Sequence, residues 1–116
     1  MTKVPIDFVW SSLPFPALLI NPEDVITEAN PAAEGFFNTS GKSLCGKSIW
    51  KQLVVGVPLE ESFARVKQFL TPLFVNDVEV SSFGKSQLQC NLTFAPVVQS
   101  PGHVIMLIAP RELAGE

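Results

Sequence analysis

Two stretches of the chain carry apolar residues at helical spacing. The first lies near the start, with apolar positions at Ile6, Val9, Trp10 and Leu13. The second has intervals of four, three and four residues, at Leu59, Phe63, Val66 and Leu70. These two stripes predict an amphipathic helix within an N-terminal segment, 1–13, and a longer helix over 58–70.

Other stretches carry patterns that are typical of strands. An apolar run at 17–20 and a second predicted strand at 25–28 flank an Asn-Pro-Glu-Asp turn, which predicts a hairpin. Further along, apolar and polar positions alternate over 78–81 and again, strictly, over 87–94. A last apolar run covers 103–109. The sequence therefore predicts five strands, two before the middle of the chain and three after it.

The middle of the chain is predicted to be helical. Asn30 followed by Pro31 is a typical helix start, because Asn accepts an unpaired amide and proline at the first helical position needs no N–H. Short helical or irregular pieces are expected over 43–53. A hairpin, then helices, then three consecutive strands indicates one antiparallel sheet with helices on one face, which is an α+β fold.

Composition narrows the class of function. A net charge of −3 does not fit the basic surface of a nucleic-acid binder, and no apolar run approaches the ~20 residues of a membrane span. The sequence shows no export signal, which favours reduced thiols at Cys45 and Cys90 in a cytoplasmic protein. Because 47% of the residues are apolar and only 16% charged, we expect some apolar surface to need a partner.

A resemblance to a known family supports this element order. The central signature of PAS domains resembles the stretch over 29–53, ANPAAEGFFNTSGKSLCGKSIWKQL. The similarity covers about residues 12–112. It extends to LPFPALLINPEDVITEANPAAEGFF, GVPLEESFARVK, PGHVIML and a trailing Arg111. That combination resembles the N-terminal PAS domain of NtrB-type nitrogen-regulation sensor histidine kinases.

The resemblance implies a fold, a role and partners. It implies a five-stranded antiparallel sheet with helices over one face, here within 14–110. It also implies a cytoplasmic regulatory module that forms a homodimer and continues through 111–116 into a C-terminal kinase region absent from this chain. Family members work with an NtrC response regulator and a PII protein. Because no His-Glu-x-x-Asn phosphoacceptor occurs here, we expect the chain by itself not to be an enzyme.

We expect no cofactor, metal or catalytic site. Light-sensing PAS relatives place a reactive cysteine three residues after a glycine that matches Gly46, where this chain has Ile49. Cys45 is therefore interpreted as a small packed side chain. The predicted long helix carries no histidine for haem, and His103 borders a Pro-Gly turn. Two cysteines and one histidine at distant positions match no metal-ligand spacing.

One string in the sequence fits a phosphate-loop pattern, Gly-x-x-x-x-Gly-Lys-Ser over 41–48. A working phosphate loop follows a buried strand and opens a helix in a parallel sheet. The predicted order of elements provides neither, so we interpret the match as a coincidence.

Two functional sites remain as hypotheses. Large aromatic residues either fill the core or line a pocket for a small organic ligand: Phe36, Phe37, Trp50, Phe63, Phe69 and Phe94. A filled core is favoured because protein interiors are close-packed; if a ligand pocket exists, we expect all of these except Phe69 to line it. The N-terminal helix gains little stability alone and must dock, with Trp10 as its expected anchor. The favoured interpretation is a dimer interface that comprises Ile6, Val9, Trp10 and Leu13, since two-fold homodimers are the commonest assembly. The alternative is that this helix packs only on its own domain.

Overall fold

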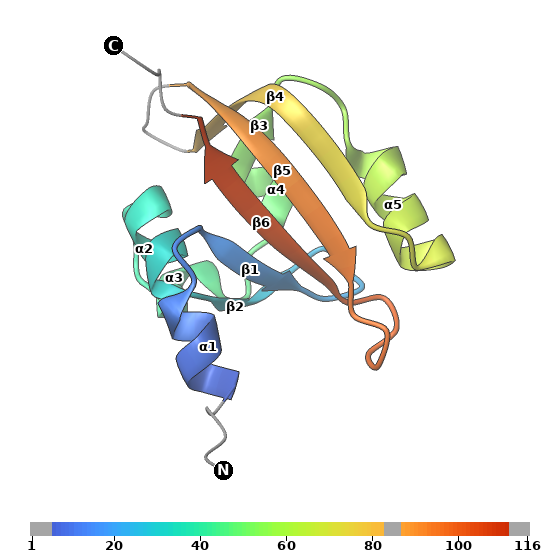
Figure 1. Cartoon of the computed structure of the whole chain (residues 1–116), viewed down its shortest axis with the longest axis horizontal. Helices are drawn as coiled ribbons and strands as arrows, with labels where there is room; N and C mark the ends of the chain where they lie inside the picture. The colour runs from blue at the N-terminus through green and yellow to red at the C-terminus, as the bar shows by residue number, and fades with distance from the viewer. Residues whose placement is uncertain (1–5, 83–86, 112–116) are drawn as a thin grey trace.

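One antiparallel sheet organises the part of the chain that this computed structural model describes, residues 6–82 and 87–111. Its strands are β1 (Ala17–Ile20), β2 (Ile26–Ala29), β3 (Leu53–Val55), β4 (Leu73–Ser82), β5 (Leu88–Pro96) and β6 (Val104–Pro110). They lie in the spatial order β2-β1-β6-β5-β4-β3, and Figure 1 shows β1, β6 and β5 side by side. Every neighbouring pair is antiparallel. The predicted single antiparallel sheet is therefore confirmed.

The number of strands differs from the prediction, because the sheet has six strands rather than five. The additional strand is β3, which begins where the segment predicted as short helical or irregular pieces ends. Three residues are too few to show an alternating pattern. β3 forms through pairing with a distant part of the chain, since Leu53 lies opposite Ser82 and Val55 opposite Val80. Its existence depends on β4, so the local sequence does not indicate it.

β4 also begins earlier than the alternating pattern indicates, at Leu73 rather than 78. The register with β5 shifts between Val75 and Val78, where Asp77 adopts a left-handed backbone with φ of 57°. Such a bulge shifts the side chains beyond it to the other face, which hides the strand period. The Asp77 N–H donates to Asn91 Oδ1 at 2.8 Å. Arg111, just after β6, donates from its backbone N–H to Gln89 O at 2.8 Å and from Nη1 to Asp77 Oδ1 at 2.6 Å.

The helices of the described chain are α1 (Ile6–Ser12), α2 (Pro31–Phe37), α3 (Gly41–Leu44), α4 (Ile49–Gln52) and α5 (Glu60–Phe69). Helices α2 to α5 cover one face of the sheet and share a single hydrophobic core with its strands. Helix α1 lies by the opposite face, because its residues line a groove with Leu19 and Ile105. Those two side chains alternate with the buried positions of β1 and β6.

Two predicted helix boundaries follow local chemistry closely. Asn30 has an extended backbone, its Oδ1 accepts from the Ala33 N–H at 2.9 Å, and Pro31 is the first helical residue of α2. α5 ends at Phe69, and Leu70 closes it in a left-handed conformation with φ of 54°. None of the described helices has the length and apolar content needed to cross a bilayer. The predicted segments 1–13 and 111–116 lie partly outside the described residues.

Candidate functional site

An aromatic cluster occupies the space between α5 and the sheet. Trp50 of α4 lies edge-on to Phe63 of α5, with ring centroids 5.4 Å apart and an interplanar angle of 88°. Phe63 lies edge-on to Phe94 of β5 at 5.3 Å and 78°. Phe63 is 1% exposed and Phe94 is fully buried. Edge-to-face contacts of this kind stabilise a filled aromatic interior beyond the effect of burial alone.

The other predicted pocket residues lie apart from this cluster. Phe36 and Phe37 of α2 form their own edge-on pair, with centroids 5.1 Å apart. Phe37 is buried in the core, and Phe36 packs against the core while partly exposed. Phe69 is 62% exposed and faces away from the interior. The structure thus brings together Trp50, Phe63 and Phe94, while the role of all five predicted pocket residues in binding a ligand stays a prediction.

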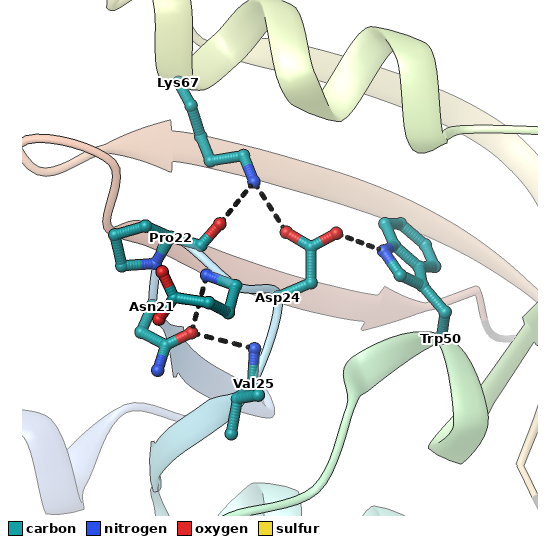
Figure 2. A network of polar contacts seen from close by, with 7 residues as sticks. Asn21, Pro22, Asp24, Val25, Trp50 and Lys67 are labelled. Atoms are coloured by element: carbon teal, nitrogen blue, oxygen red, sulfur yellow. Dashed lines mark hydrogen bonds and ion pairs between the residues drawn. The ribbon is translucent and has the colours of Figure 1, made fainter.

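A polar network contacts the aromatic cluster through Trp50, as Figure 2 shows. Lys67 Nζ donates to Asp24 Oδ1 at 2.6 Å and to Pro22 O at 3.1 Å. The second carboxylate oxygen of Asp24 accepts from Trp50 Nε1 at 2.9 Å. Lys67 Nζ also lies 5.0 Å from the centroid of the Phe63 ring, within range of a cation–π interaction. One carboxylate therefore joins α4 and α5 to the turn between β1 and β2.

Local hydrogen bonds hold the turn between β1 and β2 and position the Asp24 carboxylate. Asn21 Oδ1 accepts from the N–H groups of Glu23 and Val25, at 2.9 and 3.0 Å. Asp24 adopts a left-handed conformation with φ of 64°, which Asp tolerates better than most residues. Its carbonyl oxygen accepts from the Ile49 N–H at 2.9 Å, at the start of α4. The sequence predicts the turn, but it gives no sign that Asp24 and Lys67 meet.

The second candidate site is the surface formed by α1 and the outer face of the sheet. Val9, Trp10 and Leu13 line a groove of about 310 Å³ with Leu19 and Ile105. Phe8 is 63% exposed and Val9 45% exposed, so α1 presents apolar side chains to solvent as well. Trp10 Nε1 is buried and has no hydrogen-bond acceptor among the described residues. The side chain of Ile6, a predicted interface residue, lies outside the described part.

The two cysteines lie in different environments. Cys90 is fully buried on β5, as predicted, and burial raises the pKa of its thiol. Cys45 is exposed, so its interpretation as a packed side chain was wrong. Its Sγ lies 3.2 Å from Thr27 O, and the adjacent Gly46 has φ of 91°, which turns the chain at the surface. Ile49 is fully buried in the core.

The structure also bears on the phosphate-loop string and on the residue types that bind metals. The string Gly-x-x-x-x-Gly-Lys-Ser over 41–48 contains the four-residue helix α3, and all the sheet pairs are antiparallel. It therefore lacks the strand and helix that a phosphate loop requires. Within 6–82 and 87–111, His, Cys, Asp and Glu side chains do not gather in threes as a metal site would need.

Comparison with known proteins identifies the class of this fold. The family model described as the PAS fold matches residues 10–109. The chain belongs to the PAS family. Over 114 residues it is 44% identical to the sensory histidine kinase/phosphatase NtrB of Rhodobacter capsulatus, which confirms the predicted likeness to NtrB. That match covers 98% of this chain and 32% of the relative, so the chain spans about a third of that protein's length.

Solved structures show the same fold. The PAS domain of the nitrogen regulation protein NR(II) from Vibrio parahaemolyticus has a TM-score of 0.80 at 19% identity, over 94% of this chain and 100% of that one. A PAS domain solved in complex with ethanol, from a LuxR-family transcriptional regulator of Burkholderia thailandensis, has a TM-score of 0.65. It is 14% identical and covers 92% of this chain and 97% of that one. At these identities the likeness supports the fold alone.

Proposed function

We propose that this chain is the sensory PAS module of a two-component nitrogen-regulation histidine kinase. The identity of 44% over 114 residues to NtrB carries this proposal. In the proposal the module works in the cytoplasm, forms a homodimer and transmits a conformational bias to a kinase region that follows it. Contacts with an NtrC-type response regulator and a PII protein are made through the full-length kinase. The enzymatic activity belongs to that whole protein, and this PAS domain regulates it.

The dimer surface in this proposal is α1 together with the outer face of the sheet. Apolar residues of neighbouring strands lie side by side on that face, since Ile105 pairs with Leu19 on one side and with Ala95 on the other. Phe74 lies beside Thr93 and is 64% exposed. A large apolar surface on a domain with few charged residues is typical of a contact with another protein. Two-fold homodimers are the commonest assembly, which favours a second copy.

Sedimentation tests the dimer surface. We expect Trp10→Ala to shift the protein from dimer to monomer, because buried aromatic side chains carry much of the binding energy of an interface. Phe69→Ala is the matched control, since it removes an exposed aromatic ring from α5 on the opposite side of the sheet. A dimer that survives Trp10→Ala would count against α1 as the interface.

A second candidate function is the sensing of a small molecule in the core. The structural relative solved in complex with ethanol supports it. The close edge-to-face packing of Trp50, Phe63 and Phe94 favours instead a module without a bound cofactor. An absorbance spectrum and a native mass spectrum of the purified protein distinguish the two. A chromophore or a stoichiometric mass adduct would replace the first proposal by the second.

A further inference from the structure

One buried amide joins three segments of the chain. Asn30 is fully buried, and its Oδ1 accepts from the N–H groups of Ala17 and Ala33, each at 2.9 Å. Its Nδ2 donates to Phe15 O at 3.0 Å and to Trp10 O at 3.5 Å. Both ends of the carboxamide are therefore used, and they serve different parts of the molecule.

The acceptor end holds the core, and the donor end holds the N-terminal helix. Ala17 begins β1 and Ala33 lies in the first turn of α2, so Oδ1 fastens the corner between them. Trp10 lies in α1, and Phe15 lies in the connector that follows it. A carboxylate at this position would keep two acceptor oxygens and lose both donors. It would also place a negative charge against two carbonyl oxygens.

The attachment of α1 is otherwise weak. It has seven residues, and a helix of this length is not stable in water without packing. Phe8 stays 63% exposed and Val9 45% exposed while the helix is docked. Docking also buries Trp10 Nε1 without an acceptor among the described residues, and an unpaired buried donor carries a desolvation cost.

We propose that α1 exchanges between a docked and a released position, and that the Asn30 carboxamide couples this exchange to the corner between β1 and α2. A shift of that corner moves the two donors away from Phe15 O and Trp10 O and favours release. The coupling itself does not require a dimer. It rests on the proposed function in one respect, namely that α1 forms the dimer surface and its release would then weaken the dimer.

Amide hydrogen exchange of the intact chain, followed by mass spectrometry, tests this coupling with Asn30→Asp. We expect exchange in a peptide covering α1 to rise about tenfold, the ratio typical of losing a hydrogen bond or two, while β5 exchanges as in the wild type. An α1 peptide that exchanges at the wild-type rate in a folded Asn30→Asp protein overturns the proposal. Asn30→Ala is the contrasting variant, because it also removes both acceptor contacts and should accelerate exchange throughout the core.

A second measurement decides the matter if Asn30→Asp unfolds and β5 loses its protection as well. In the wild-type protein, α1 should exchange about tenfold faster than β5 or more, because its release does not require the core to unfold. Equal protection of α1 and β5 overturns the proposal in that case. Sedimentation of the same samples separates the two claims. A wild-type protein that stays monomeric ends the dimer proposal, while the exchange rates still decide the coupling.

Discussion

Helices α5 and α1 lie on opposite faces of the same sheet and are attached to it in different ways. α5 buries Phe63 and Val66 in the core and is joined to the β1–β2 turn by a charged contact, Lys67 with Asp24. α1 leaves Phe8 exposed and receives its polar contact from a neutral amide, that of Asn30. The inner helix is thus fixed by burial and charge together, whereas the outer helix depends on a few apolar contacts. We therefore expect α1 to be easier to displace from the sheet than α5.

The strongest test of this contrast is the removal of the central aromatic ring of the core. We expect Phe63→Ala to lower the free energy of unfolding by about 3–5 kcal/mol, because it opens a cavity between Trp50 and Phe94. Denaturant titration followed by circular dichroism measures the loss. Phe69→Ala on the same helix removes an exposed ring and should cost less than about 1 kcal/mol. Similar losses for both variants would mean that α5 is not anchored through its buried face.

The charged contact of α5 gives an intermediate effect. Lys67→Met keeps the aliphatic stem but leaves Asp24 without its cation, and we expect a loss of about 1–2 kcal/mol in the same titration. The control is Arg65→Met, since Arg65 pairs with Glu61 at 3.7 Å on an exposed surface. Exposed pairs contribute little, so this variant should change stability by less than about 0.5 kcal/mol. If the two substitutions have equal effects, the Asp24 network adds nothing to the attachment of α5.

The smallest effect concerns the buried thiol of β5. Burial raises the pKa of Cys90 in the folded protein, so the thiolate is favoured only after unfolding. The stabilising contribution is complete below the pKa of the unfolded thiol, about 8.5, and is lost as the pH rises through the folded pKa. We expect stability to decline above that pH, and Cys90→Ala to remove this part of the decline. A decline that persists unchanged in Cys90→Ala would contradict this prediction.

The features that could be predicted from the sequence are those set by neighbouring residues. Asn30 before Pro31 fixes the start of α2 through local capping, and the apolar stripe of α5 needs only its own helix. β3 and the first half of β4 escaped prediction, because one exists only by pairing with a distant strand and the other contains a bulge at Asp77. The contact between Asp24 and Lys67 joins residues that are far apart in sequence, and neither position carries a signal of the other.

The candidate sites likewise combine features set by the local sequence with features set by distant contacts. The sequence identified Trp50, Phe63 and Phe94 as large core residues. Their edge-to-face contacts depend on the packing of α4, α5 and β5 against one another. Exposure of Cys45 was not predicted, because the turn at Gly46 depends on contacts with the hairpin. The predicted interface of α1 stays a prediction until the state of association is measured.

The contacts of Arg111 set a practical boundary for protein engineering. Its backbone N–H bonds to Gln89 and its guanidinium to Asp77, so the hydrogen bonding of the sheet continues one residue past β6. A domain excised at residue 110 would lose both contacts and leave the carboxylate of Asp77, in the β4 bulge, without its cation. A chimaeric receptor joined after Arg111 keeps them. The junction with a new output domain therefore belongs after residue 111.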